Sequence, residues 1–216
     1  HYPLRRQRQM CIRDRGSSVE KIYHQFILPP EELKVAAWRN ARVLLDHGYT
    51  SLYSAGALGD QIEPELARAI AAGETPGPRL VPSTLERSPE GEEGVETGDV
   101  FNGRGPEAMR AFVAYCAAEG VKSLKLVISG EDALKPGSSQ DILYTDAEMI
   151  AAGEAAKEAG LWIATHAYSP RAINLALEAG ARILYHCSFA DDAAVDAMAA
   201  KKDAIFYAPG PGVSVA

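Results

Sequence analysis

Apolar residues along this chain recur with two alternating periods. Between Pro30 and Gly48 they fall on one face of a helix, and the segment TSLYSA that follows is a short run typical of a strand. The same succession recurs toward the C-terminus, with helices predicted at about 62–72 and 106–119, before Gly160, before Gly180 and after Asp191. The predicted strand cores cover roughly 50–55, 79–84, 123–129, 161–166, 182–188 and 204–208.

Capping residues mark several of the predicted helix starts. Thr145 and Glu148 have the spacing of a capping box, in which each side chain bonds to the backbone of the other residue. Ser169 and Pro170 suit the N-cap and first position of the next helix, directly after the strand at 161–166. The sequence therefore predicts a short junction between that strand and its helix.

Strands that alternate with helices of this length indicate βαβ units and a parallel sheet. A closed (β/α)8 barrel needs eight strands and typically about 250 residues, whereas the pattern shows six strands. The predicted fold class is therefore α/β, an incomplete TIM (β/α)8 barrel with about six of eight βα units. The acidic, Gly-rich segment 86–104 is expected to be an exposed βα loop, either a solvated insertion or an active-site lid.

The composition is that of a globular protein, with 47% hydrophobic and 24% charged residues among 216. A net charge of -7 without a basic stripe beyond the N-terminus argues against a nucleic-acid partner. No run approaches the roughly 20 apolar residues of a membrane span, so no membrane partner is expected. Cys11, Cys116 and Cys187 form no CxxC pair, which favours reduced thiols and a cytoplasmic location.

Residues 1–15 differ from the rest of the chain. HYPLRRQRQMCIRDR carries five Arg and one Asp, begins with His, and lacks the apolar core of a secretory signal. QMCIRDR resembles translated sequencing-adapter read-through, so residues 1–15 are interpreted as a non-native leader. Residues 16–216 are then expected to form a partial barrel domain, truncated at both ends.

Side-chain alternation identifies the candidate chemical groups. In SLKLVIS, Leu124, Leu126 and Ile128 share one apolar face that suits packing against helices, so Lys125 should point into the barrel. Lys125 thereby becomes a candidate for the functional site.

Two histidines end the next two predicted strands. His166 shares a strand face with Trp162 and Ala164, and His186 shares one with Leu184 and Ser188. Cys187 should then point away from His186, as a buried apolar filler. Each histidine alone is more typical of a hydrogen-bonded core residue, but catalytic groups in these barrels gather at the C-terminal ends of several strands.

Lys, His and His at one barrel rim permit two chemistries. Neutral imidazoles bind metal ions, and a buried lysine can be carbamylated to an anionic bridge between two ions roughly 3.5–4 Å apart. Alternatively, Lys125 could attack a carbonyl directly, as in a Schiff-base lyase of the aldolase type. A non-catalytic, degenerate barrel is a third interpretation.

The chain resembles the metal-dependent amidohydrolase superfamily, and most closely its branch related to imidazolonepropionase and the Xaa-Pro and Xaa-Arg dipeptidases. The matching stretches include AIAAGETPGPRL, VKSLKLVISG, IATHAYSPRAINLALEAGARILYHCSF and DDAAVDAMAAKKDAIFYAP, and together they cover most of residues 30–210. The succession of the Lys, THAY and YHC units in this order is the specific part of the resemblance.

The resemblance implies that Lys125 is the carbamylated bridging lysine and that His166 and His186 bind the second of two divalent ions, expected to be zinc. It also implies a His-x-His pair at the first strand, an Asp at the eighth and a β-sandwich segment, none of which the 216 residues supply. From its position two residues after His166, Tyr168 is expected either to line the substrate pocket or to be a packing residue at the strand end.

The expected function is a hydrolase of C–N bonds in amides, peptide-like compounds or cyclic amides, acting through a metal-bound hydroxide. The substrate is a small molecule, and a homo-oligomer is possible for the intact protein. Deaminases, lactonases and phosphotriesterases would use related ligands. The 216 residues themselves are expected to be inactive, because most ligands of the first metal and the general base are missing.

Overall fold

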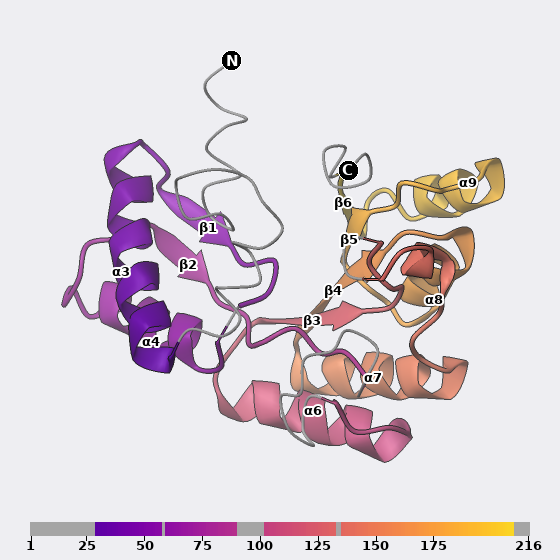
Figure 1. The fold of residues 1–216 in the computed structure, drawn as a ribbon, viewed down its shortest axis with the longest axis horizontal. Coiled ribbons are helices and arrows are strands. Elements are labelled where there is room, and N and C mark those ends of the chain that lie inside the picture. The colour runs from indigo at the N-terminus through magenta and orange to yellow at the C-terminus, as the bar shows by residue number, and fades with distance from the viewer. Residues whose placement is uncertain (1–28, 58, 90–101, 133–134, 210–216) are drawn as a thin grey trace.

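Helices and strands alternate throughout the computed structural model, which describes residues 29–57, 59–89, 102–132 and 135–209 (Figure 1). Predicted strands and helices all occur there, although every strand except the one at 162–167 is shorter than expected. The elements are α3 (Pro30–Asp46), β1 (Ser51–Tyr53), α4 (Ile62–Ala71), β2 (Arg79–Val81), α6 (Pro106–Ala118), β3 (Ser123–Val127), the 3-10 turn η1 (Ser138–Gln140), α7 (Asp146–Ala159), β4 (Trp162–Ala167), α8 (Pro170–Glu178), β5 (Ile183–His186), α9 (Asp192–Ala200) and β6 (Phe206–Ala208).

All paired strands are parallel and follow one another in chain order. β3, β4, β5 and β6 form one sheet, and β1 pairs with β2. The segment after β2 joins the two parts, because Leu85 bridges to Ala57 and Arg87 bridges to Leu126. The Arg87 N–H donates to the Lys125 carbonyl oxygen at 2.9 Å, and the Val127 N–H donates to the Arg87 carbonyl oxygen at 3.0 Å. This order confirms the predicted incomplete barrel of the α/β class.

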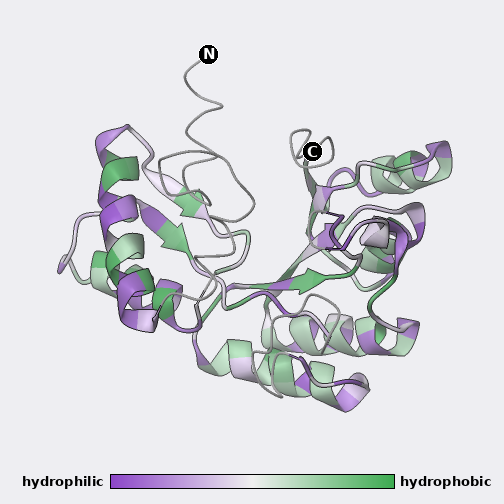
Figure 2. Ribbon diagram, viewed as in Figure 1, coloured by the Kyte–Doolittle hydropathy of each residue, from purple (hydrophilic) through white to green (hydrophobic). Residues whose placement is uncertain are grey.

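The main core lies between β3–β5 and helices α6, α7 and α8. Figure 2 shows hydrophobic residues along β3 and along α6 and α7 beneath it. Leu124, Leu126 and Ile128 are fully buried in this core together with Met109 and Phe112 of α6. The predicted apolar face of β3 therefore packs against the helices, and Lys125 lies on the opposite face.

The predicted caps are present at the helix starts. Thr145 Oγ1 accepts the Glu148 N–H, and the Glu148 carboxylate accepts the Thr145 N–H at 2.7 Å, which completes the capping box of α7. Ser169 Oγ accepts the Ala172 N–H at the start of α8. Only two residues thus separate the end of β4 from the start of α8, and this short junction holds the end of β4 against the helix layer.

Some expectations fall on residues outside the described ranges. The proposed leader at 1–15, Cys11 and most of the loop at 86–104 lie there, since residues 1–28 and 90–101 are not described. Cys116 and Cys187 are both buried free thiols. Within the described ranges, no helix has the length and apolar character required to cross a membrane.

Candidate metal centre

Two of the three side chains predicted to share a site, His166 and His186, meet at the C-terminal ends of β4 and β5, while Lys125 lies in the middle of β3. The imidazole rings of His166 and His186 have centroids 4.6 Å apart and planes inclined by 65°. Lys125 pairs in register with Ala164, on the strand face of β4 that carries His166. Its Nζ lies over the ring of Tyr185, which is the register partner of His166. The structure therefore brings the two imidazoles into contact and places Lys125 on the same face of the sheet.

Lys125 is almost completely buried, at 4% exposure, and its amine has two oxygen partners. Nζ donates to the Ala55 carbonyl oxygen at 3.0 Å and to Oε1 of Glu86 at 3.3 Å. Nζ also lies 4.9 Å from the ring centroid of Tyr185. The carboxylate and the aromatic face are both favourable electrostatic neighbours for this buried amine.

His166 is buried at 6% exposure, on the same strand face as Ala164. Its Nε2 lies 3.4 Å from the Gly130 carbonyl oxygen and 3.9 Å from Oε2 of Glu131. Burial above all, and then the positive charges of His186 and Lys125, hold the pKa of His166 well below its ordinary value. The imidazole is consequently neutral near pH 7, which is the form that can donate a lone pair to a metal ion.

His186 reaches the site by a different route from the one that strand alternation predicts. The register pairs His166 with Tyr185, and Leu184 is buried in the helix-side core. Regular alternation would therefore turn His186 toward the helices together with Leu184. His186 and Cys187 instead have φ angles of +70° and +50°, a left-handed conformation that turns the imidazole into the site.

The environment of His186 favours a neutral, electron-donating ring. Burial and then the Lys125 ammonium lower the pKa of His186 to about 4. Its Nδ1 is buried and has no hydrogen-bond partner among the described residues. A buried polar nitrogen without a partner is unfavourable unless it binds something, and a metal ion would satisfy it. Cys187, by contrast, lies in the helix-side core, as expected of a filler.

Tyr168 packs against both histidines. Its ring meets His166 edge-on at 4.6 Å between centroids and lies 4.8 Å from His186. Its hydroxyl donates to Oε2 of Glu131 at 2.9 Å, and the residue is only 2% exposed. Arg171, near the start of α8, does not take part in this cluster, because its side chain is exposed and pairs with Asp146.

Two carboxylates at the site were missed by the sequence interpretation. Glu86 follows β2 and contacts Lys125, and Glu131 follows β3 and contacts Tyr168. Both come just after a predicted strand, so position relative to the strand ends was an available signal. The acidic segment 86–104 that begins with Glu86 was instead expected to be an exposed loop, either a solvated insertion or an active-site lid.

The residues present fit part of a divalent metal site. Two neutral imidazoles, one of them with an unpartnered buried nitrogen, suit a borderline ion such as zinc. Within the described ranges, however, no group of three or more His, Cys, Asp and Glu side chains is arranged to hold an ion. The pair of histidines and Lys125 therefore fit as a partial donor set.

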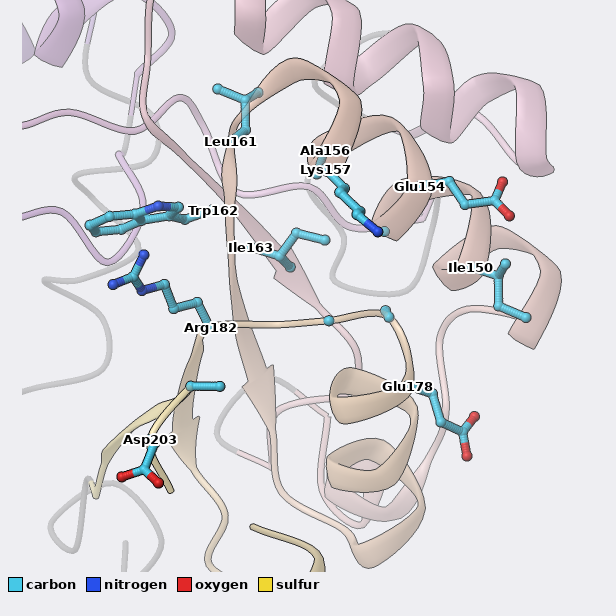
Figure 3. A pocket seen from close by; sticks show the side chains of 14 residues that line it. Ile150, Glu154, Ala156, Lys157, Leu161, Trp162, Ile163, Glu178, Arg182 and Asp203 are labelled. Carbon is cyan, nitrogen blue, oxygen red and sulfur yellow. The ribbon is translucent and has the colours of Figure 1, made fainter. Parts of the chain in front are cut away.

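A pocket of about 590 Å³ lies at the other end of the same strands. It is lined by the beginnings of β4 and β5 and the ends of α7 and α8, and Figure 3 shows Trp162 and Arg182 side by side there. The Arg182 guanidinium lies 3.9 Å from the Trp162 ring centroid. This pocket is separate from His166 and His186, which lie at the opposite ends of their strands.

Comparison with known proteins gives matches among solved structures. No protein-family model matches the chain, and no curated protein matches it. A putative prolidase from Bifidobacterium longum is 28% identical, with a TM-score of 0.66. The match covers 77% of this chain and 40% of the prolidase chain. A Xaa-Pro dipeptidase with methionine bound in its active site is 24% identical, with a TM-score of 0.74. The match covers 84% of this chain and 47% of the dipeptidase chain. An amidohydrolase is 24% identical over 85% of this chain and 48% of its own, with a TM-score of 0.72.

The chain thus spans about half the length of the solved structures that it matches. The parallel strand order agrees with the resemblance drawn from the sequence. The described residues therefore share the barrel fold of solved prolidase, Xaa-Pro dipeptidase and amidohydrolase structures.

Proposed function

We propose that the intact protein is a metal-dependent hydrolase of C–N bonds in amides, peptide-like compounds or cyclic amides. The observation that carries this proposal is the pair of buried, neutral imidazoles of His166 and His186, 4.6 Å apart at adjacent strand ends. The solved structures with this architecture include prolidases and an amidohydrolase, which adds support from relatives.

His166 and His186 would hold one of two divalent ions, expected to be zinc. Lys125, carbamylated on Nζ, would bridge that ion to the other one. Ions bound there would supply Lewis-acid polarisation of a carbonyl and lower the pKa of water enough for attack at neutral pH. The remaining ligands and a general base would come from segments other than residues 29–209.

Lys125 must change its partners for this role. Carbamylation replaces the ammonium cation with an anion, so the contact of Nζ with Glu86 becomes repulsive. The Glu86 side chain is 42% exposed and can turn toward solvent, whereas Lys125 is enclosed. Lys125 would thus keep its place in the barrel while Glu86 moves.

We propose a small peptide-like substrate, with Tyr168 forming part of the wall around its reacting bond. The Tyr168 ring covers both imidazoles and is held by Ser129, whose Oγ accepts the Tyr168 N–H at 2.9 Å. A rigid aromatic wall beside the ligands would restrict how a substrate carbonyl approaches them. Replacing Tyr168 should accordingly change substrate preference in the intact protein.

The test is zinc binding by the 216-residue chain. Isothermal titration of metal-free protein with Zn²⁺ is expected to show binding by the unaltered chain. The Zn²⁺ affinity should be at least about tenfold lower in each of the two separate variants, His166→Asn and His186→Asn. His47→Asn is the matched control, since His47 is exposed and its Nδ1 lies 2.6 Å from the Val43 carbonyl oxygen of α3, away from the site. Equal affinity in all four proteins would contradict the proposal.

Turnover is a separate question. We propose that these 216 residues bind metal but do not hydrolyse amides, because they supply only part of the donor set. A panel of dipeptides and amides should give no rate above background. Chelator-sensitive turnover would overturn this statement, and trapping of a keto substrate on Lys125 by borohydride would favour the Schiff-base alternative.

A further inference from the structure

We propose that Glu131 is a positioning residue, whose carboxylate acts through Tyr168 to fix the imidazoles of His166 and His186. This inference rests on the proposed function, in which the two histidines are metal ligands. The geometry points to it through a continuous series of contacts that runs from the loop after β3 to both rings.

The loop that carries Glu131 is held firmly over the strand ends. At Gly130, a Cβ atom would lie only 2.6 Å from the carbonyl oxygen of Ser138, so glycine allows the loop to pack directly on η1. On the other side, the Asp132 carboxylate accepts the backbone N–H of Ser139 at 2.9 Å and its hydroxyl at 3.0 Å. Glu131 is therefore fixed on both sides and has little freedom to move away from the site.

Glu131 contacts two aromatic side chains of the site. Its Oε2 accepts the Tyr168 hydroxyl at 2.9 Å and lies 3.9 Å from Nε2 of His166. The Glu131 side chain is 17% exposed, so water competes weakly for the hydrogen bond. A hydrogen bond from a phenol to a carboxylate is stronger than one between neutral groups, and it orients the ring that donates it.

The Tyr168 ring transmits this orientation to the histidines. Its centroid lies 4.6 Å from that of His166 and 4.8 Å from that of His186, and the two imidazoles are 4.6 Å from each other. Three rings in mutual contact and largely buried cannot rotate independently. A shift of Tyr168 would therefore displace both imidazoles, and the ligand geometry that a metal ion requires would be lost.

His186 has particular need of such support. Its φ of +70° is a conformation that a residue with a side chain adopts at a cost, so the surrounding contacts must hold it. The contact with Tyr168 is one of these. Outer groups that orient metal-binding histidines commonly alter metal affinity by about 10- to 100-fold when removed.

The experiment compares four variants of the full chain. Glu131→Ala and Tyr168→Phe each remove one partner of the hydrogen bond, Glu131→Gln keeps an acceptor oxygen, and the double variant removes both partners. Glu154→Ala is the control, because Glu154 is an exposed carboxylate on α7 that pairs with Arg110. The readouts are Zn²⁺ affinity by titration and, in metal-free protein, the imidazole tautomers of His166 and His186 by long-range ¹H–¹⁵N NMR.

Glu131→Ala and Tyr168→Phe are each expected to lower Zn²⁺ affinity at least about tenfold and to change the tautomer populations of both histidines. Glu131→Gln should recover most of the affinity. The double variant should bind as each single variant does, because both changes break one and the same link. A merely structural loss would instead lower the melting temperature without this non-additivity.

The two proposals fail in different ways. If the unaltered chain does not bind Zn²⁺, the proposed function fails, and the NMR measurement still decides on Glu131. Unchanged imidazole signals in Glu131→Ala and Tyr168→Phe would overturn the positioning role. If the unaltered chain binds Zn²⁺ and both variants bind equally well, the metal site stands and the role of Glu131 is refuted.

Discussion

Glu148 offers a quantitative test of how the helix layer is held in place. Its carboxylate accepts the Gly105 N–H at 2.6 Å and the Thr145 N–H and Oγ1–H at 2.7 and 2.9 Å. Gly105 is the N-cap of α6 and Thr145 is the N-cap of α7. One buried side chain, with 2% exposure, thus joins the starts of two helices.

The perturbation is Glu148→Gln, which keeps the shape but replaces one carboxylate oxygen with an amino group. One N–H of Gly105 or Thr145 would then face another donor, and the remaining bonds would lose their charge. Hydrogen bonds to charged groups contribute about 1.5–3 kcal/mol each, so the expected loss of unfolding free energy is about 2–3 kcal/mol at pH 7.

The pH dependence of this difference follows from the pKa of Glu148. Burial alone would raise that pKa, but the hydrogen bonds from the Thr145 and Gly105 backbone, from the Thr145 hydroxyl, and the nearby Arg104 hold it below the ordinary value. A lowered folded-state pKa means that the contribution is fully present above the unfolded value of about 4.3. It is lost as the pH falls through the folded-state pKa.

The assay is urea unfolding followed by circular dichroism at pH values from 7 to 3, for the unaltered chain and Glu148→Gln. The difference in unfolding free energy between the two proteins should persist down to about pH 5 and shrink at lower pH. Glu154→Gln, an exposed carboxylate on the same helix, should stay within about 0.5 kcal/mol. A difference in unfolding free energy below about 0.5 kcal/mol at pH 7, or a difference that does not change with pH, would refute the reasoning.

Two further predictions concern backbone space and core packing. Gly56→Ala should destabilise the chain by more than Gly48→Ala: both have positive φ angles, which alone costs about 1 kcal/mol, but only at Gly56 would a Cβ lie 2.5 Å from Glu86. Equal losses in urea unfolding would show that the Glu86 contact is relieved without cost. Phe112→Ala, at a fully buried site, should cost about 3–5 kcal/mol, whereas Val35→Ala, at 69% exposure, should cost less than about 0.5 kcal/mol. Similar midpoints for both variants would argue against the core described between β3 and α6.

Much of the fold could be predicted from local patterns. The apolar face of β3 and the capping residues of α7 and α8 occur where the sequence indicates. These features depend on neighbours within a few residues, so alternation and capping chemistry suffice to predict them. The inward position of Lys125 follows from the same alternation.

The orientation of His186 could not be predicted in this way. Strand periodicity assigns it the same face as Leu184, which packs against the helices. Only the left-handed conformation at residues 186 and 187 turns the ring toward His166, and that conformation is held by contacts with Tyr168 and His166. The two imidazole rings therefore lie in contact because of a backbone conformation that strand periodicity does not predict.

The sequence alone determined the order of helices and strands, the residues that cap them and the side chains that can do chemistry, because these depend on local periodicity and residue type. The tertiary structure decided which of those side chains meet. Glu86 reaches Lys125, and Glu131 reaches Tyr168, across 39 and 37 residues of chain. Such contacts depend on strand register and loop packing, which arise only when distant segments are buried against one another.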